Sequence, residues 1–337
     1  MANFEWPRNR ISAFTAFAAE LLVLSAWPPL AYAQQQTQGF AVERFYPSAP
    51  GGGWFVMDDV NISGGLGGAI SLTTGYSRNP LVVTSSNGAQ RLILVSNEAF
   101  VDVGVAVTYD RYRVYLNLPV PLLVAGNSGT VGPFPVTAPS LNIAQNPDTI
   151  SDSRVGFDTR LLGKPGSSFR LGAGAQLIIP SGNRPDYVSD GRYRGMFRLL
   201  PAGDIGRFSY AGQLGLHIRP AEGLLLPGSP DGNELLFGVS AGRRFSVRSG
   251  WAVVVGPEFF GETAVRSSSN GQTGFEGLLT GRLERTSDRP HPRIKVGIGH
   301  GLVQHFGAPE WRILAGVELI SERPSPPASN NSGRRFP

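Results

Sequence analysis

Charged side chains recur at every second position in several stretches of this sequence, with mostly apolar residues between them. That spacing would put the charges on one face of an extended strand. If such strands enclose a common interior, fixed charges of both signs either pair with each other or line a polar path that selects ions. The residues predicted to line this interior are Glu98, Asp102, Arg154, Asp158, Arg160, Arg170, Arg192, Arg194, Arg198, Glu258, Glu262, Glu276, Arg282, Glu284, Arg293, Lys295, Arg312 and Glu318.

Residues suited to enzymatic chemistry are few and lack a recognisable context. His217, Ser209 and Glu262 fall on the same predicted face, but no nucleophile elbow surrounds the serine. His217 is predicted to be a hydrogen-bonding residue of the interior, and His291, His300 and His305 are spaced unlike metal ligands. The chain has no cysteine. The glycine-rich stretches lack the strand-then-helix setting of a phosphate loop. The sequence therefore predicts no enzyme, no metal site and no cofactor.

The stretch 191–220 shows the elements that must carry these charges. Tyr193, Phe197 and Leu199 share one face, the intervening arginines share the other, and the alternation resumes after a short turn at Asp204-Ile205. Such a short turn pairs two strands in an antiparallel hairpin. Similar alternation predicts strands at 66–77, 92–107, 113–125, 153–163, 168–180, 191–203, 206–219, 232–245, 250–262, 274–285, 292–302 and 311–320.

The connections between these segments alternate between long and short. The stretches 78–91, 126–152 and 220–231 are long, whereas 164–167 and 204–205 are short. Outer-membrane barrels have short periplasmic turns and longer extracellular loops, whereas a soluble sandwich has no reason to sort its loops in this way. The sequence therefore predicts an all-β protein, a transmembrane antiparallel up-and-down β-barrel of about twelve strands, with fourteen as the alternative count.

The two ends of the sequence are predicted to lie outside the barrel. Arg8 and Arg10 precede a mostly apolar run that ends at the small-residue cleavage pattern before Gln34, which predicts a signal peptide over 1–33 cleaved between Ala33 and Gln34. Residues 34–53 are polar and then rich in Pro and Gly, and are predicted to form a flexible periplasmic leader. The barrel would then occupy 54–320, followed by a disordered tail over 321–337.

Several short motifs resemble the N-terminal barrel of myxobacterial-type OmpA-family outer membrane proteins. They are GFAVERF from Gly39, WFVMD from Trp54, AGDIG from Ala202 and VGPE from Val255, with Tyr76 before NPLV from Asn79. The resemblance runs from about Gly39 to Ile320 and implies a porin-like barrel in the outer membrane. Members of that family continue into acidic repeats and a peptidoglycan-binding domain, neither of which follows here, so cell-wall anchoring is not implied.

Taken together, these features predict a porin-like passive channel for small polar solutes in the outer membrane of a Gram-negative bacterium. Glycines predicted to face inward, at 172, 174, 238, 242, 297, 299 and 301, would leave room for water. The alternative is a non-conducting structural or adhesion barrel whose loops or tails bind partners. Expected partners are outer-membrane lipid and lipopolysaccharide, the barrel-assembly machinery and small polar solutes. A net charge of +5 spread along the strands indicates no nucleic-acid partner.

Overall fold

A computed structural model describes residues 39–62, 64–85, 88–132, 134–220, 232–247, 250–265, 273–285, 290–304 and 307–322. The predicted signal peptide and its cleavage site, residues 34–38 of the predicted leader and residues 323–337 of the predicted tail lie outside this part. Within the described residues, no helix is long and apolar enough to span a membrane.

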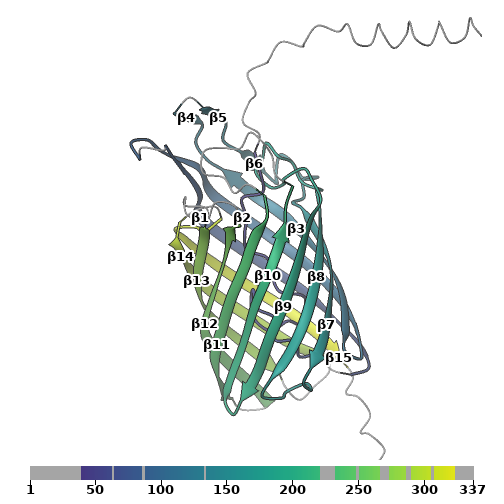
Figure 1. Ribbon diagram of the computed structural model, residues 1–337. Helices are drawn as coiled ribbons and strands as arrows, with labels where there is room; N and C mark the ends of the chain where they lie inside the picture. The colour runs from purple at the N-terminus through teal and green to yellow at the C-terminus, as the bar shows by residue number, and fades with distance from the viewer. Residues whose placement is uncertain are drawn as a thin grey trace, which may run out of the picture. The chain divides into compact units, whose positions relative to one another are not determined.

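The described chain forms a closed antiparallel barrel of twelve strands, which confirms the predicted fold (Figure 1). Strand β1 closes the barrel because it pairs with β2 on one side and with β15 on the other. The barrel strands are β1 (Leu66–Thr84), β2 (Arg91–Tyr109), β3 (Tyr112–Ala125), β7 (Ser153–Leu162), β8 (Arg170–Ile179), β9 (Arg194–Ile205), β10 (Phe208–Ile218), β11 (Glu234–Ser246), β12 (Trp251–Ala264), β13 (Thr273–Arg285), β14 (His291–Val303) and β15 (Trp311–Glu322).

The two faces of each strand differ in the way that the alternation predicts. In β2, Val103, Val105 and Val107 are 44–55% exposed on the outer face. Asp102 and Ala106, on the inner face of the same strand, are 1% and 3% exposed. Exposed aromatic residues mark both ends of the outer surface, with Tyr109, Tyr112 and Phe208 near the short turns and Tyr193 and Trp311 near the long loops. This outer surface suits a hydrocarbon layer bounded by two interfaces.

The long connections build a cap at one end of the barrel. Strands β1 and β2 extend beyond the predicted ranges, and the connection after β3 carries a hairpin of β4 (Gly129–Val131) and β5 (Phe134–Val136). The short strand β6 (Ser140–Asn142) pairs with the end of β3. Apolar side chains from these parts pack together in a buried cluster that includes Leu81, Leu94, Val124, Val136 and Tyr187. The cap lies at the top of Figure 1.

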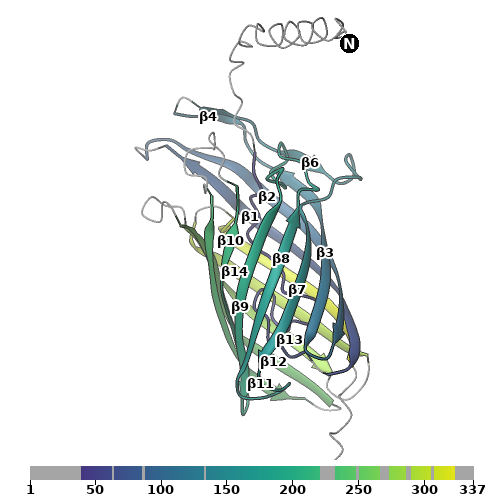
Figure 2. The same ribbon diagram turned by 45° about the vertical axis from the view of Figure 1, so that its right-hand side comes forward.

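The segment before β1 is not a mobile leader. Residues 39–62, which we call the plug, run inside the barrel as an irregular chain, drawn in purple in Figure 2. At one end, the backbone N–H of Val42 donates to the Tyr187 carbonyl oxygen, within a long loop. At the other end, Arg160 donates to the Ile62 carbonyl oxygen, close to a short turn. The plug therefore threads the lumen from the long loops to the short turns.

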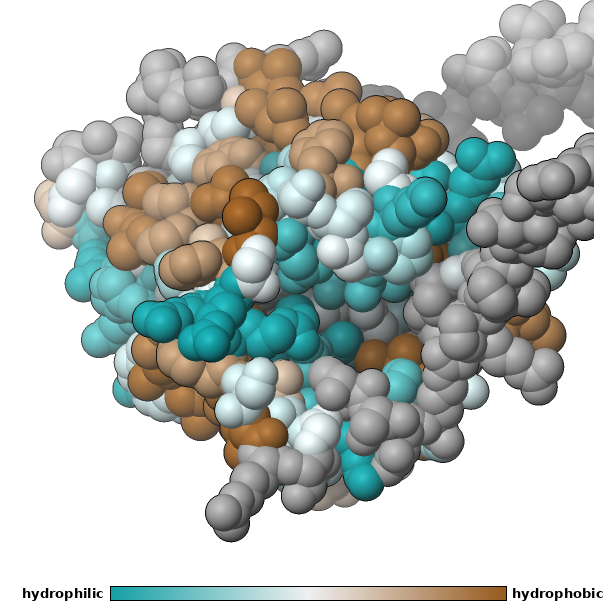
Figure 3. All heavy atoms as spheres, turned by 90° about the horizontal axis from the view of Figure 1, so that it is seen from below, coloured by the Kyte–Doolittle hydropathy of each residue, from teal (hydrophilic) through white to brown (hydrophobic). Residues whose placement is uncertain are grey.

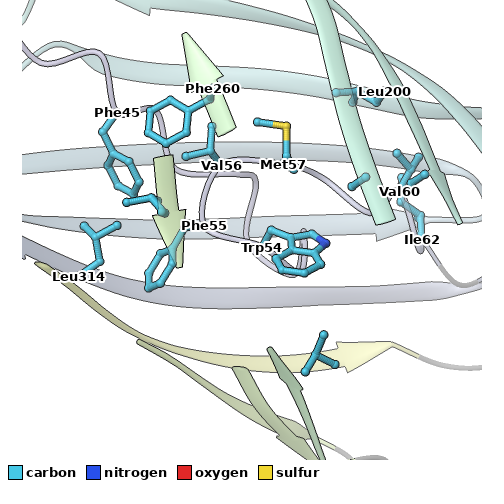
Figure 4. Close-up of a cluster of buried hydrophobic side chains, with 14 of the residues drawn as sticks. Phe45, Trp54, Phe55, Val56, Met57, Val60, Ile62, Leu200, Phe260 and Leu314 are labelled. Carbon is cyan, nitrogen blue, oxygen red and sulfur yellow. The ribbon is translucent and has the colours of Figure 1, made fainter. Parts of the chain in front are cut away.

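The prediction of a flexible periplasmic leader is thus wrong for residues 39–53, because apolar side chains in this segment are removed from water. Trp54 and Phe55, which the sequence places at the start of the barrel, also belong to the plug and are fully buried. They pack with Phe45, Val56 and Met57 against side chains from the barrel wall, including Leu200, Phe260 and Leu314 (Figure 4). Burial of large apolar side chains is the dominant favourable term in folding, and here it holds the plug in the lumen.

Both ends of the described chain can be assigned to opposite ends of the barrel, which gives a topology prediction. An epitope inserted directly before Gly39 should be accessible to antibody on intact cells, as should one in the 126–152 loop, because long loops face outward in outer-membrane barrels. An epitope inserted after Glu322 should be protected, since β15 ends beside the start of β1 at the short-turn end. Labelling of the Glu322 epitope but not of the Gly39 epitope would contradict this orientation of the plug.

Candidate functional site

The lumen holds the candidate site, and Glu258 holds the plug at mid-barrel. Its carboxylate lies on β12, is fully buried, and accepts hydrogen bonds from the backbone N–H groups of Phe55 (2.9 Å), Val56 (3.0 Å) and Met57 (3.3 Å). The hydroxyl of Thr280 donates to the same carboxylate at 2.6 Å. A charged acceptor facing successive backbone donors makes stronger bonds than a neutral one. The irregular backbone of the plug is therefore satisfied by a side chain from the barrel wall.

Cations from the wall satisfy the carbonyl groups of the same part of the plug. Lys295 on β14 donates to the Trp54 carbonyl oxygen at 3.2 Å and pairs with Glu318 at 2.8 Å. The guanidinium group of Arg282 lies over the Trp54 ring at 5.1 Å from its centroid. Such a stack is favourable, the more so when it is removed from water. The wall is thus complementary to the plug in both hydrogen bonding and aromatic contact.

The inward glycines do leave room, but the plug fills that room. A Cβ atom added at Gly242 would lie 2.6 Å from the Trp54 ring, and one at Gly297 would lie 2.9 Å from the Phe55 ring. At Gly238 the nearest atom would be the Met57 methyl carbon. The interpretation that these glycines mark a water-filled path is therefore wrong for these positions. They allow large plug side chains to approach the strand backbone.

At the long-loop end, Asp190 ties the plug to the extracellular loops. Its Oδ1 accepts the backbone N–H of Ala41 at 2.8 Å, and its Oδ2 accepts two bonds from Arg219 at 2.6 and 2.9 Å. Arg194 lies 3.3 Å from the same oxygen. Burial alone would raise the pKa of Asp190, but the guanidinium groups of Arg194, Arg219 and Arg44 hold it well below its usual range. The carboxylate is therefore charged whenever the loop is folded at neutral pH.

This depressed pKa predicts a pH dependence of stability. A carboxylate whose pKa is lower in the folded state stabilises the fold above its unfolded pKa of about 4, and the contribution is lost as the pH falls towards the folded value. Asp190→Asn should therefore lower the free energy of unfolding at pH 7, and the difference from wild type should shrink as the pH falls below about 4. Denaturant titrations at several pH values would measure it. A difference that stays constant down to pH 2 would contradict the role of the Asp190 charge.

At the short-turn end, buried ion pairs join the plug to strands β3, β7 and β9. Arg113 pairs with Asp58 of the plug and also with Asp158 at 2.7 Å. Asp158 in turn lies 3.2 Å from Arg198. These charges pair with each other, so they do not present a basic surface to water. Removing one member of a buried ion pair is strongly destabilising, because the charge of the other member stays buried and uncompensated.

Most of the residues predicted to line the interior do face it. Fifteen of them are buried, namely Glu98, Asp102, Arg154, Asp158, Arg170, Arg194, Arg198, Glu258, Glu262, Glu276, Arg282, Glu284, Lys295, Arg312 and Glu318. Arg160 and Arg293 are partly exposed, and each donates a hydrogen bond to a plug carbonyl group, at Ile62 and Gly51 respectively. Arg192 does not belong to the wall, because it precedes β9 and is exposed.

The burial of the inward-facing charged residues shows what fills the lumen. Side chains that line a water-filled pore stay accessible to water, whereas Asp158, Arg170 and Glu258 are fully buried between the wall and the plug. Seen from the short-turn end, polar residues run across the middle of the face and apolar residues gather towards its edges (Figure 3). A cavity of about 60 Å³ does lie between the plug and the wall, beside Tyr46, Glu98, Phe100 and Arg154. The lumen described here is packed around the plug.

Sequence reasoning missed the partners that these residues need. Arg44 and Asp58 lie in the plug, Asp190 lies in a loop, and Arg113 and Glu234 lie on the inner face of strands that were predicted. The alternation Arg113, Tyr115, Asn117 in β3 could have identified Arg113. For the plug, the signal was the apolar run Trp54 to Met57, which is too apolar for a mobile leader.

The fold matches solved outer-membrane barrels at low sequence identity. An outer membrane channel from Pseudomonas putida F1 superposes with a TM-score of 0.52 and 11% identity, over 76% of this chain and 96% of that one. The NanC porin gives a TM-score of 0.42 and 8% identity, over 75% and 99% of the two chains. The chain has an outer-membrane barrel fold. No family model matches the sequence, and no curated protein matches it either.

The sequence predicts no enzyme, and the comparison with solved structures contradicts that prediction. The matched structures include LpxR from Salmonella typhimurium, a deacylase barrel, with a TM-score of 0.34 and 11% identity over 74% of this chain and 99% of that one. A likeness at this level assigns no activity to this chain. The prediction that this chain is not an enzyme is therefore withdrawn.

Proposed function

We propose that this chain is a channel of the Gram-negative outer membrane that is closed by its own plug and that passes small polar solutes when the plug leaves the lumen. The observation that carries the proposal is the contact at mid-barrel, where Glu258 accepts three backbone N–H groups of the plug. The inner wall is rich in Arg, Glu and Asp, as in polar pores. Without the plug, these side chains would face water.

The proposal includes the route by which the chain reaches the membrane. Export would use the signal peptide over 1–33, with cleavage between Ala33 and Gln34, and insertion would use the barrel-assembly machinery. The outer apolar surface would then contact lipid, with lipopolysaccharide around the long loops. The resemblance to the barrel of myxobacterial-type OmpA-family proteins supports the same address.

The test compares the mature barrel with a variant that lacks residues 39–62. In planar bilayers the intact barrel should show little or no single-channel current, and the shortened barrel should show steady current. Both proteins must first give the same strand signature in far-ultraviolet circular dichroism, so that loss of the fold is excluded. Steady current through the intact barrel would contradict the closed state.

A second candidate function follows from the same packing. The closed lumen and the buried apolar cap around Leu81, Val136 and Tyr187 also suit a structural or adhesion barrel that presents its long loops to partners. The two candidates differ in one result. If the folded variant without residues 39–62 carries no current, the channel proposal fails and the structural barrel is supported.

A further inference from the structure

Three buried side chains meet on the inner wall near the long-loop end, next to the plug. His217 on β10, Glu234 on β11 and Glu262 on β12 come from three neighbouring strands, and His217 and Glu234 are directly paired in the β-ladder. His217 is fully buried, and the two glutamates are 1% and 6% exposed. One ligand atom from each residue lies within 4.8 Å of the others. Their strand positions fix this triad in place.

The distances within the triad are long for hydrogen bonds. His217 Nδ1 lies 3.3 Å from Glu234 Oε2 and 3.4 Å from Glu262 Oε2. A good N–H···O bond spans about 2.7–3.2 Å. Ligands at about 2.0–2.2 Å from a tetrahedral ion lie about 3.3–3.6 Å from each other. The two distances from the imidazole lie at the long end of the hydrogen-bond range and also match the edge of a coordination tetrahedron.

A second observation is that the triad leaves polar atoms without partners. Glu234 Oε2 and Glu262 Oε1 are buried and have no hydrogen-bond partner among the described residues, although Oε2 of Glu234 faces the imidazole. An unsatisfied buried acceptor costs about 1–3 kcal/mol, and more when it is charged. A cation held between the imidazole and Oε2 of Glu234 would remove that cost for this oxygen. The other oxygen of Glu234 is already satisfied by Arg219, which donates to it at 2.7 Å.

The surroundings leave space and charge for an ion. A cavity of about 20 Å³ lies beside Arg44 and Glu262 and borders neither His217 nor Glu234. A water molecule needs about 10–15 Å³, so this cavity has room for a water next to Glu262. The guanidinium group of Arg44 in the plug lies 3.4 Å from the Glu262 carboxylate and 3.6 Å from the Glu234 carboxylate. The one hydrogen bond described for this guanidinium group goes to the Ala41 carbonyl oxygen. The positive charge of Arg219 is shared with Asp190. The two carboxylates are thus only partly neutralised by arginine.

We propose that His217, Glu234 and Glu262 bind a divalent transition-metal ion of the zinc type, with water as the fourth ligand. An imidazole with two carboxylates suits Zn²⁺ and its first-row neighbours, whereas Ca²⁺ and Mg²⁺ prefer oxygen ligands alone. The Tyr46 ring of the plug packs edge-on against the imidazole at 5.9 Å between ring centroids and fixes its orientation. This site does not depend on whether the barrel conducts.

Calorimetric titration of the folded full-length mature barrel in detergent, after treatment with a chelator, tests the site. ZnCl₂ should bind at one equivalent, and CaCl₂ and MgCl₂ should not bind there. His217→Asn and the isosteric Glu262→Gln should each weaken zinc binding at least tenfold. The matched control is His300→Asn, since His300 contacts only the Glu310 carbonyl oxygen among the contacts described for it and lies outside the triad.

Two results would overturn the proposal. One is zinc binding that is substoichiometric in the wild-type barrel, and the other is equal binding by His217→Asn and by wild type. If the triad variants do not fold, the wild-type protein still decides the question through Co²⁺. Intense visible absorption, as tetrahedral Co²⁺ with nitrogen and oxygen ligands gives, supports the site, and the weak spectrum of hydrated Co²⁺ rejects it.

Discussion

Replacing Glu258 with alanine should turn a closed barrel into a conducting one. The substitution removes the shared acceptor of the Phe55, Val56 and Met57 N–H groups and leaves these donors unsatisfied in the lumen. A single unsatisfied buried donor costs about 1–3 kcal/mol, and every 1.4 kcal/mol shifts an equilibrium about tenfold. Once the plug leaves the lumen, water satisfies all three donors, so the substitution destabilises only the closed state and the open population should rise at least tenfold. Single-channel recording measures this directly.

The matched control for this prediction is Glu310→Ala. Glu310 is exposed in a long loop, where its carboxylate accepts a hydrogen bond from Asn79 and makes no described contact with the plug. The Glu310→Ala substitution changes the net charge by the same amount as Glu258→Ala and should leave the current unchanged. If the Glu258→Ala barrel folds correctly and still carries no current, the apolar contacts of the plug are enough to hold it in the lumen. That result would contradict the proposal that Glu258 anchors the plug.

The second large effect is expected on the outer surface. Leu279 lies at the centre of β13, is 54% exposed, and faces the predicted hydrocarbon layer. An arginine on the lipid-facing side of a barrel costs about 2–4 kcal/mol at the bilayer midplane and about 0–1 kcal/mol near the interfaces. Leu279→Arg should therefore lower the free energy of unfolding by about 2–4 kcal/mol in lipid vesicles, as measured by denaturant titration of tryptophan fluorescence.

The control for Leu279→Arg uses the depth dependence of this cost. Val247 is also exposed, but it follows β11 at the short-turn end, close to the predicted interface. Val247→Arg should cost at most about 1 kcal/mol. Equal costs at the two positions would mean that the outer surface does not face a bilayer with the predicted register, even though the barrel itself is closed.

The sequence alone determined the wall of the barrel. Strand periodicity is local, since alternate side chains of an extended chain must point to opposite faces. It was therefore enough to separate Val103 and Val105 from Asp102, to find twelve strands, and to identify the long and short connections as two different ends. The strand limits were less certain, because β1 and β2 continue into the cap, where tertiary packing around Leu81 and Leu94 extends them.

Only the tertiary structure decided what the wall encloses. The plug has no periodicity of its own, because its backbone is satisfied by Glu258, Lys295 and other wall residues that are hundreds of positions away in the chain. The inward glycines by themselves predict empty space, because no local feature of the sequence shows that the Trp54 and Phe55 rings occupy it. The pairing of Arg219 with Asp190 likewise depends on how the folded loops bring the two residues together. A charge at an inward position is visible in the sequence, but its neutralisation depends on contacts between distant parts of the chain.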